Sequence, residues 1–114
     1  MLYGLFIQDA PTASEAFHGA ARFASALVQR GHLVRQIFLY EDAVLAAAQA
    51  LPSGLKGLDA LMTVAQAHGI PVLACQAAID RLGITFAAGT TIKAGSLGQW
   101  FDALHELDRV QGFA

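Results

Sequence analysis

Short apolar runs alternate with longer amphipathic stretches along the whole chain. The run Leu2–Ile7 carries no charged side chain, a pattern typical of a strand that is buried on both faces. After it, Phe17, Ala21 and Val28 recur at helical spacing as far as Gly31, a residue type that commonly ends a helix. This change of period predicts that the chain begins with a β-strand and continues into an α-helix.

The same alternation continues to the end of the sequence. We expect a second strand over 33–40, a short helix over 42–50 that begins at Asp42, a helix over 58–68 and a third strand over 72–74. Further helices are expected over 77–82 and 97–107, with a fourth strand over 90–93 and a fifth over 109–113. Strands that alternate with helices predict an α/β fold, in which helices cover both faces of a parallel sheet. No repeat or linker interrupts the pattern, so residues 1–114 are expected to form one domain.

The start of the first helix has two interpretations. Thr12 and Glu15 have the spacing of a capping box, in which each side chain bonds the free backbone N–H of the other residue. Residues 11–14 would also suit a small anion at a helix N-terminus. Capping alone explains these residues, and it is the interpretation that we prefer.

The composition indicates contacts between subunits. Hydrophobic residues make up 55% of the chain and charged residues only 14%, against roughly 25% charged in an ordinary soluble domain. We expect the surplus apolar surface to be buried between subunits; the alternative is an alanine-rich monomer with a neutral surface. Trp100 and Phe101, in the last predicted helix, are expected to face the sheet, with a subunit contact as the other possibility.

The charge pattern and the apolar runs exclude several functions. The formal net charge is −2 and the cations are scattered, so the basic patch that nucleic-acid binding requires is missing. No apolar run reaches the ~20 residues of a membrane helix. The first residues indicate a strand and not a signal peptide, and a single cysteine cannot form an internal disulfide. A reducing, cytoplasmic setting is therefore expected.

The residues at the ends of the predicted strands are the candidates for chemistry. In open parallel sheets, ligands bind outside the carboxyl ends of the strands. That rule selects Asp9, Tyr40–Asp42, Cys75 and the Gly95–Ser96 turn. Cys75 is the most reactive group among them.

Cys75 stands where the third strand passes into a helix. There its sulfur would face free backbone N–H groups, those of Gln76 and Ala77, and the positive end of the helix dipole, which both stabilise a thiolate. With no second cysteine, a sulfur atom bound as a persulfide is released only by the thiol of a partner. The alternative interpretation is that Cys75 is a small buried hydrophobe at a strand end.

Other catalytic arrangements lack support. The four histidines, His18, His32, His68 and His105, show no metal-ligand spacing, and the sequence leaves open whether one of them approaches Cys75 in the fold. The glycine-rich motifs of dinucleotide and P-loop nucleotide binding are absent after the strands. These observations argue against a metal site and against binding of a dinucleotide or a P-loop nucleotide.

The surroundings of the cysteine resemble a known family. Residues 75–84, with small residues, an arginine and Gly-Ile after the cysteine, resemble the active-cysteine segment of DsrE/TusD-type sulfur-transfer proteins. The resemblance extends over nearly the whole chain, through Phe17–His32, Phe38–Val44, the Gly95–Gly98 turn and the segment from Asp108 to Phe113.

This resemblance implies a fold and an activity. The fold would be a three-layer α/β/α sandwich with a five-stranded, mainly parallel sheet, assembled into homo- or hetero-oligomers. Cys75 would act as the nucleophile and sulfur carrier of a sulfurtransferase or sulfur-relay protein. It would receive sulfur from a TusA-like carrier or a rhodanese and pass it to a TusE/DsrC-like protein, in tRNA thiolation or sulfur oxidation. No metal or organic cofactor is implied. Apart from the resemblance, Arg81 lies more than one helical turn after Cys75, where it could add positive charge near the thiolate or could equally be a solvated helix residue.

Two departures from the family pattern affect this prediction. The connection between Gly83–Ile84 and Gly95 is shorter than in typical members, which is expected to leave Cys75 more open or to change its partner. Ala43 stands where the family usually has glycine.

Two alternatives to the sulfur-carrier hypothesis remain open. One is a non-catalytic structural subunit of a DsrE-like oligomer, since relatives without the cysteine exist. The other is an anion-binding module that uses the helix starts at Thr12 and Ser96.

Overall fold

Parallel strands form the centre of the molecule in the computed structural model, which describes residues 1–12 and 15–114. Across these residues the strands form one sheet in the order β4-β3-β2-β1-β5, and every neighbouring pair is parallel. The strands are β1 (Leu2–Ile7), β2 (Leu33–Leu39), β3 (Val72–Cys75), β4 (Lys93–Gly95) and β5 (Arg109–Phe113). The α/β class and the sheet predicted from the sequence are therefore confirmed.

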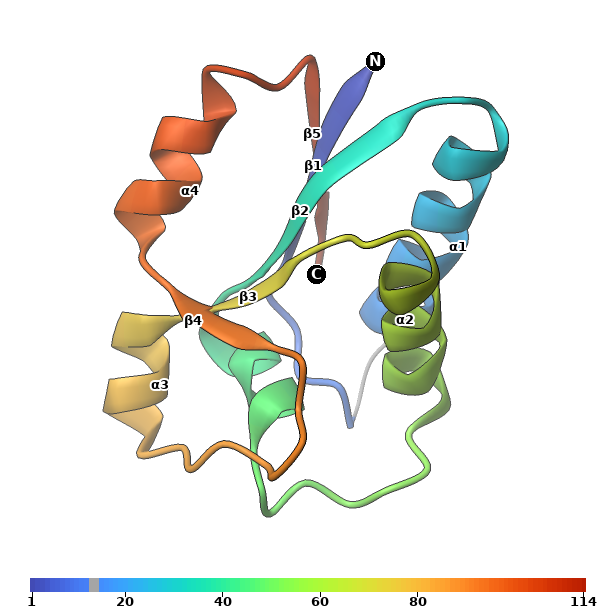
Figure 1. Cartoon of the computed structure of the whole chain (residues 1–114). Helices are drawn as coiled ribbons and strands as arrows, with labels where there is room; N and C mark the ends of the chain where they lie inside the picture. The colour runs from blue at the N-terminus through green and yellow to red at the C-terminus, as the bar shows by residue number, and fades with distance from the viewer. Residues whose placement is uncertain (13–14) are drawn as a thin grey trace.

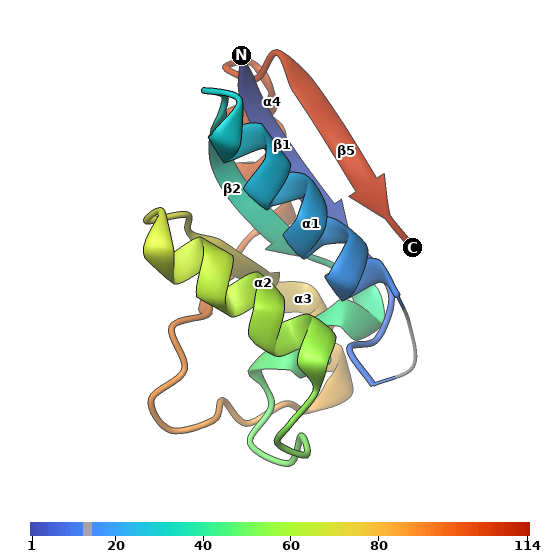
Figure 2. The same ribbon diagram turned by 90° about the vertical axis from the view of Figure 1, so that its right-hand side faces the viewer.

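Helices cover both faces of this sheet. Helices α1 (Ala16–Gln29) and α2 (Lys56–Ala67) pack together on one face, whereas α3 (Gln76–Leu82) and α4 (Leu97–Leu104) lie on the other (Figure 1, Figure 2). A 3₁₀ helix, η1 (Glu41–Ala47), follows β2. This is the three-layer sandwich that the alternating pattern predicts. Among the described residues, no helix is both long enough and apolar enough to cross a membrane.

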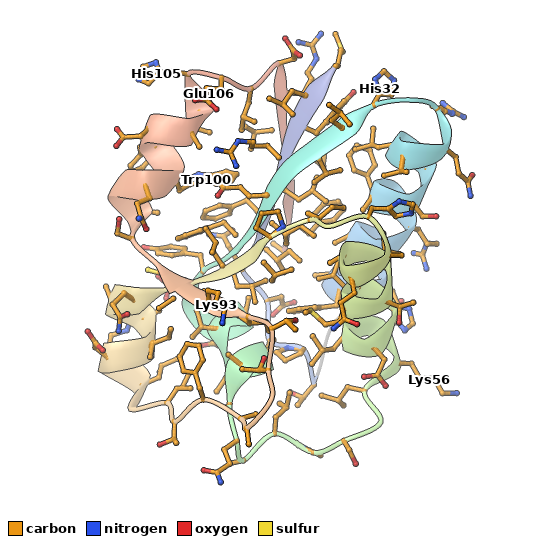
Figure 3. All side chains as sticks on the ribbon, in the orientation of Figure 1. His32, Lys56, Lys93, Trp100, His105 and Glu106 are labelled. Carbon is orange, nitrogen blue, oxygen red and sulfur yellow. The ribbon has the colours of Figure 1, made fainter. Side chains whose placement is uncertain are left out.

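Apolar side chains fill both faces of the sheet. On the face that α4 covers, the indole of Trp100 packs on Phe6 and Phe38, with ring centroids 5.4 and 5.6 Å apart. Figure 3 shows Trp100 directed from α4 toward the sheet. Because side chains alternate along a strand, Leu5 and Ile37 face α1 and α2. Trp100 is buried, as expected, but Phe101 is 54% exposed, so its predicted place in the core is wrong.

Among these elements, three differ most clearly from their predicted bounds. The fourth strand lies at Lys93–Gly95 and not at 90–93, and the last helix ends at Leu104 instead of 107. The short helix after β2 is a 3₁₀ helix that begins one residue before Asp42, so Asp42 is not its cap. Glu41 has φ +51°, a left-handed conformation that sets the start of this helix.

The predicted capping box at the first helix is also wrong. Helix α1 begins at Ala16, and its N-cap is Glu15, whose side chain makes no capping hydrogen bond. Thr12 therefore lies too far before the helix to cap it. Ala13 and Ser14, which belong to the predicted anion segment 11–14, lie outside the described residues. A capping box does occur at α4, between Ser96 and Gln99.

Candidate functional site

Cys75 lies at the carboxyl edge of the sheet, as predicted from the strand-end rule. It is the last residue of β3 and the N-cap of α3. Cys75 is in register with Gly95 on β4, and the neighbouring pair Ala74 and Leu39 places Tyr40 at the level of Cys75 on the other side. The strand register therefore brings Cys75 together with Tyr40 and the Gly95–Ser96 turn.

The thiol of Cys75 is free but covered. The residue is only 1% exposed and belongs to the hydrophobic core. The expectation that a short connection after Ile84 leaves Cys75 more open is therefore wrong for the isolated chain. The connection folds back onto η1: the Gln49 N–H donates to the carbonyl of Thr85 at 2.8 Å, and the Ala87 N–H donates to that of Ala47 at 2.8 Å. The segment lies against the molecule instead of standing away from it.

Helix α3 follows Cys75 directly, with Cys75 as its N-cap, so its first N–H groups lie next to the end of β3. The first N–H groups of any α-helix have no acceptor within the helix, and here they include those of Gln76 and Ala77. Both residues have exposed side chains. The Gln76 side-chain amide donates to Asp80 Oδ1 at 2.9 Å, one turn further on.

An ion pair connects the elements on either side of Cys75. Arg81 Nη2 on α3 lies 3.1 Å from Glu41 Oε2 at the start of η1, and both side chains are about half exposed. The hydrogen bond and the negative charge of Glu41 raise the pKa of the neighbouring Tyr40 hydroxyl, with smaller contributions from burial and from the charge of Cys75. The carboxylate of Glu41 therefore offsets part of the positive charge of Arg81, the residue proposed from the sequence to support the thiolate.

The strand-end rule identified Tyr40 and Glu41 as candidate site residues, but nothing in the sequence predicted that Glu41 pairs with Arg81. The two residues are 40 positions apart, and no local spacing relates them. Asp9, which the same rule selected, accepts a hydrogen bond from the N–H of Ala10 at 3.1 Å and acts as a turn residue.

A shallow hollow of about 300 Å³ lies where α4 begins, and its lining includes Gln76, the residue after Cys75. Its wall contains the capping box: the Ser96 N–H donates to Gln99 Oε1 at 2.8 Å, and the Gln99 N–H donates to Ser96 Oγ at 3.0 Å. The spacing Ser-x-x-Gln would have revealed this helix start in the sequence. The lining residues are Gln76, Ala94, Gly95, Ser96 and Gln99.

Two histidines lie at the end of the sheet remote from Cys75. His32 Nδ1 is 3.0 Å from the amino group of Met1, just before β2 begins. His105 is the C-cap of α4, and Figure 3 shows both residues near the end at which β1 starts. His18 packs against Gly57 of α2, and His68 ends the same helix. Within residues 1–12 and 15–114, no three His, Cys, Asp or Glu side chains are grouped so as to hold a metal ion.

Comparison with known proteins gives consistent matches. The model of the DsrE/DsrF-like family matches residues 1–111. A sulfurtransferase TusD homolog of Vibrio cholerae is 29% identical over 130 aligned positions, covering 99% of this chain and 98% of that protein. Sulfurtransferase TusD of Proteus mirabilis is 30% identical over 74% of this chain and 67% of its own length. The crystal structure of the ychN protein from E. coli superposes with a TM-score of 0.77 over 99% of this chain and all of that one, at 22% identity, which supports the fold.

Proposed function

The chain belongs to the DsrE/DsrF-like family, and from this membership together with the position of Cys75 we propose that it is a sulfur-relay protein. Curated relatives named sulfurtransferase TusD support a role of this kind. The observation that carries the proposal is that the only cysteine of the chain ends β3 and begins α3, at the carboxyl edge of a parallel sheet.

The chemistry consists of two exchange steps. The Cys75 thiolate attacks the terminal sulfur of a donor persulfide R–S–SH, forms Cys75–S–SH and releases the donor thiolate R–S⁻. An acceptor thiolate then attacks the outer sulfur of Cys75–S–SH, takes it as R′–S–SH and restores the Cys75 thiolate. Sulfur and electrons balance in each step without a metal, an oxidant or an organic cofactor.

Three groups of this chain would assist the exchange. The backbone N–H groups of Gln76 and Ala77, together with the dipole of α3, favour negative charge on Cys75 and on its persulfide. Arg81 contributes positive charge only to the extent that Glu41 does not compensate it. Donor and acceptor would be other sulfur-transfer proteins, of the TusA-like and TusE/DsrC-like kinds. A cytoplasmic setting suits this role, because thiols there stay reduced.

Cyanolysis tests the proposal. The protein is incubated with inorganic polysulfide, freed of excess reagent and treated with cyanide, which removes a sulfane sulfur as thiocyanate. We expect close to one thiocyanate per chain from the wild type and none above background from Cys75→Ser. Equal yields from the two proteins would overturn the proposal.

One observation favours a second function, that of a non-catalytic subunit in a DsrE-like oligomer. Cys75 is 1% exposed in the isolated chain, as expected of a structural core residue. In that case a strain carrying Cys75→Ser would retain the sulfur pathway of the wild type, and an active paralogue would co-purify with the chain. Loss of the pathway in this strain, with the variant still folded, would favour the relay.

A further inference from the structure

If the chain is a sulfur-relay protein, as proposed above, the burial of Cys75 is an obstacle to the reaction. A sulfur donor must reach the sulfur atom of Cys75, yet this residue is 1% exposed. Addition of further subunits would only cover it more. Some part of the chain around the end of β3 must therefore move before sulfur can be transferred.

The 3₁₀ helix η1 is the element best placed to move. It contacts both β3 and α3, the two elements that meet at Cys75. Its inner side chains, among them Ala43 and Val44, are buried, as is Ile79 of α3. The contact between η1 and α3 is thus apolar inside, and the Glu41–Arg81 ion pair lies at its exposed rim.

The two ends of η1 are held in different ways. At its C-terminal end, backbone hydrogen bonds join Ala47 and Gln49 to the segment 85–87. At its N-terminal end, one backbone hydrogen bond joins the Tyr40 N–H to the carbonyl of Ile7 on β1, at 2.8 Å. The next residue, Glu41, has the unfavourable φ of +51°, and its side chain is held by Arg81 at 3.1 Å. Backbone strain of this kind persists only where surrounding contacts maintain it. The turn that begins at Glu41, after the anchored Tyr40, is therefore the part of η1 that opens first.

We propose that the Glu41–Arg81 ion pair is a latch that holds the N-terminal end of η1 against α3 and that must open to expose Cys75. Tyr40, at the level of Cys75 in the strand register, stays joined to β1 and marks the point from which η1 opens. A donor protein that offers a charged group to Glu41 or Arg81 would open the latch as it docks. The cysteine would then be protected from adventitious oxidants while no partner is bound.

The rate at which iodoacetamide alkylates Cys75 measures this opening. Alkylation requires no sulfur donor, and a thiol that is buried in the closed state reacts only through open states. The protein has one cysteine, so the rate refers to Cys75 alone. An exposed ion pair of this kind changes an equilibrium by at most about five-fold, so we expect Glu41→Gln and Arg81→Gln to accelerate alkylation by about three-fold to five-fold.

A second ion pair provides a matched control. Arg35 Nε on β2 lies 3.4 Å from Glu106 Oε2, just after α4, and both side chains are about as exposed as those of Glu41 and Arg81. Arg35 lies in the first half of β2, away from the carboxyl edge of the sheet. Figure 3 shows Glu106 at the end of the molecule remote from α3. Glu106→Gln should leave the alkylation rate at the wild-type value. The doubly exchanged variant Glu41→Arg with Arg81→Glu should restore a rate close to that of the wild type.

Salt gives a readout that a merely structural role would not affect. Raising the ionic strength weakens exposed ion pairs, so wild-type alkylation should accelerate with salt and Glu41→Gln should lose this dependence. The latch is overturned if Glu41→Gln alkylates at the wild-type rate, or if Glu106→Gln accelerates it equally. If the Glu41 and Arg81 variants are alkylated faster but no protein takes up sulfur, the latch is supported and the relay is contradicted. If the wild type takes up sulfur but the variants are alkylated at the wild-type rate, the relay is supported and the latch is contradicted.

Discussion

At the scale of single residues, the neighbours of Cys75 matter as much as Cys75 itself. A sequence shows that a cysteine stands at a strand end, but not which charges surround it. The fold places Glu41 against Arg81, so the arginine that follows the cysteine by six residues has a carboxylate partner. It also places Tyr40 beside the same carboxylate, which gives this tyrosine a measurable titration signature.

The titration of Tyr40 tests this arrangement. Because Glu41 raises its pKa above the ordinary value of 10.0, the folded state holds the phenolic proton more tightly than the unfolded chain. Stability from this source is present below pH 10 and falls as the pH rises through the folded pKa. In a Tyr3→Phe background, which leaves Tyr40 as the only tyrosine, absorbance at 295 nm should show a midpoint above that of free tyrosine. Adding Glu41→Gln should lower this midpoint, and an unchanged midpoint would show that the carboxylate does not act on Tyr40.

At the scale of elements, the start of α4 depends on a capping box that also lines the hollow beside Cys75. Ser96→Ala removes the acceptor of the Gln99 N–H, and we expect it to lower the free energy of unfolding by about 1 kcal/mol. Thr12→Ala should change stability by less than about 0.5 kcal/mol, since α1 begins at Ala16 and Thr12 does not cap it. Urea unfolding measures both variants. A larger loss for Thr12→Ala than for Ser96→Ala would contradict the observed helix starts.

The packing of α4 on β1 leaves no space at Gly4. A Cβ atom added there would come within 2.6 Å of Leu107 Cδ1 and 2.9 Å of the Trp100 indole. We expect Gly4→Ala to destabilise the protein by about 1 to 3 kcal/mol, the usual effect of overpacking. At Gly112 the nearest atom, the carbonyl oxygen of Phe6, is 4.0 Å away, so Gly112→Ala serves as the control. Similar unfolding midpoints for the two variants would mean that α4 packs differently.

The elements were predictable to different degrees, for physical reasons. The strand Leu2–Ile7 has no charged residue, and the second half of Leu33–Leu39 is apolar and buried, so the position of both strands follows from the apolar runs. The strand Lys93–Gly95 has three residues, two of them exposed, and only its pairing with β3 defines it. The candidate cysteine followed from its position at a strand end. Its burial and the Glu41–Arg81 pair depend on contacts between distant segments, which no local pattern encodes.

At the scale of the whole molecule, large apolar side chains remain on the surface of the single chain. Phe101 on α4 is 54% exposed and Val110 on β5 is 49% exposed. In a chain with so few charges, we expect these positions to contact other subunits. Light scattering should give a molar mass of at least twice the 12.0 kDa of one chain.

The exposed phenyl ring of Phe101 offers a direct test of assembly. Phe101→Ser should shift the protein toward smaller species, because the apolar contact is lost. Asp102→Asn, a polar change at the next position of the same helix, should leave the molar mass unchanged. A wild-type protein that is monomeric at all concentrations would contradict the expectation of subunit contacts.

The most direct test of the central claim, that Cys75 carries sulfur, is the intact mass of the protein after incubation with a persulfidated donor. Wild type and Cys75→Ser are compared before and after treatment with a reductant. We predict that the wild type gains one sulfur atom, that the reductant removes it, and that Cys75→Ser gains none. An unmodified wild type whose thiol is shown to be free, or an equal gain in Cys75→Ser, would contradict the claim and favour a structural subunit.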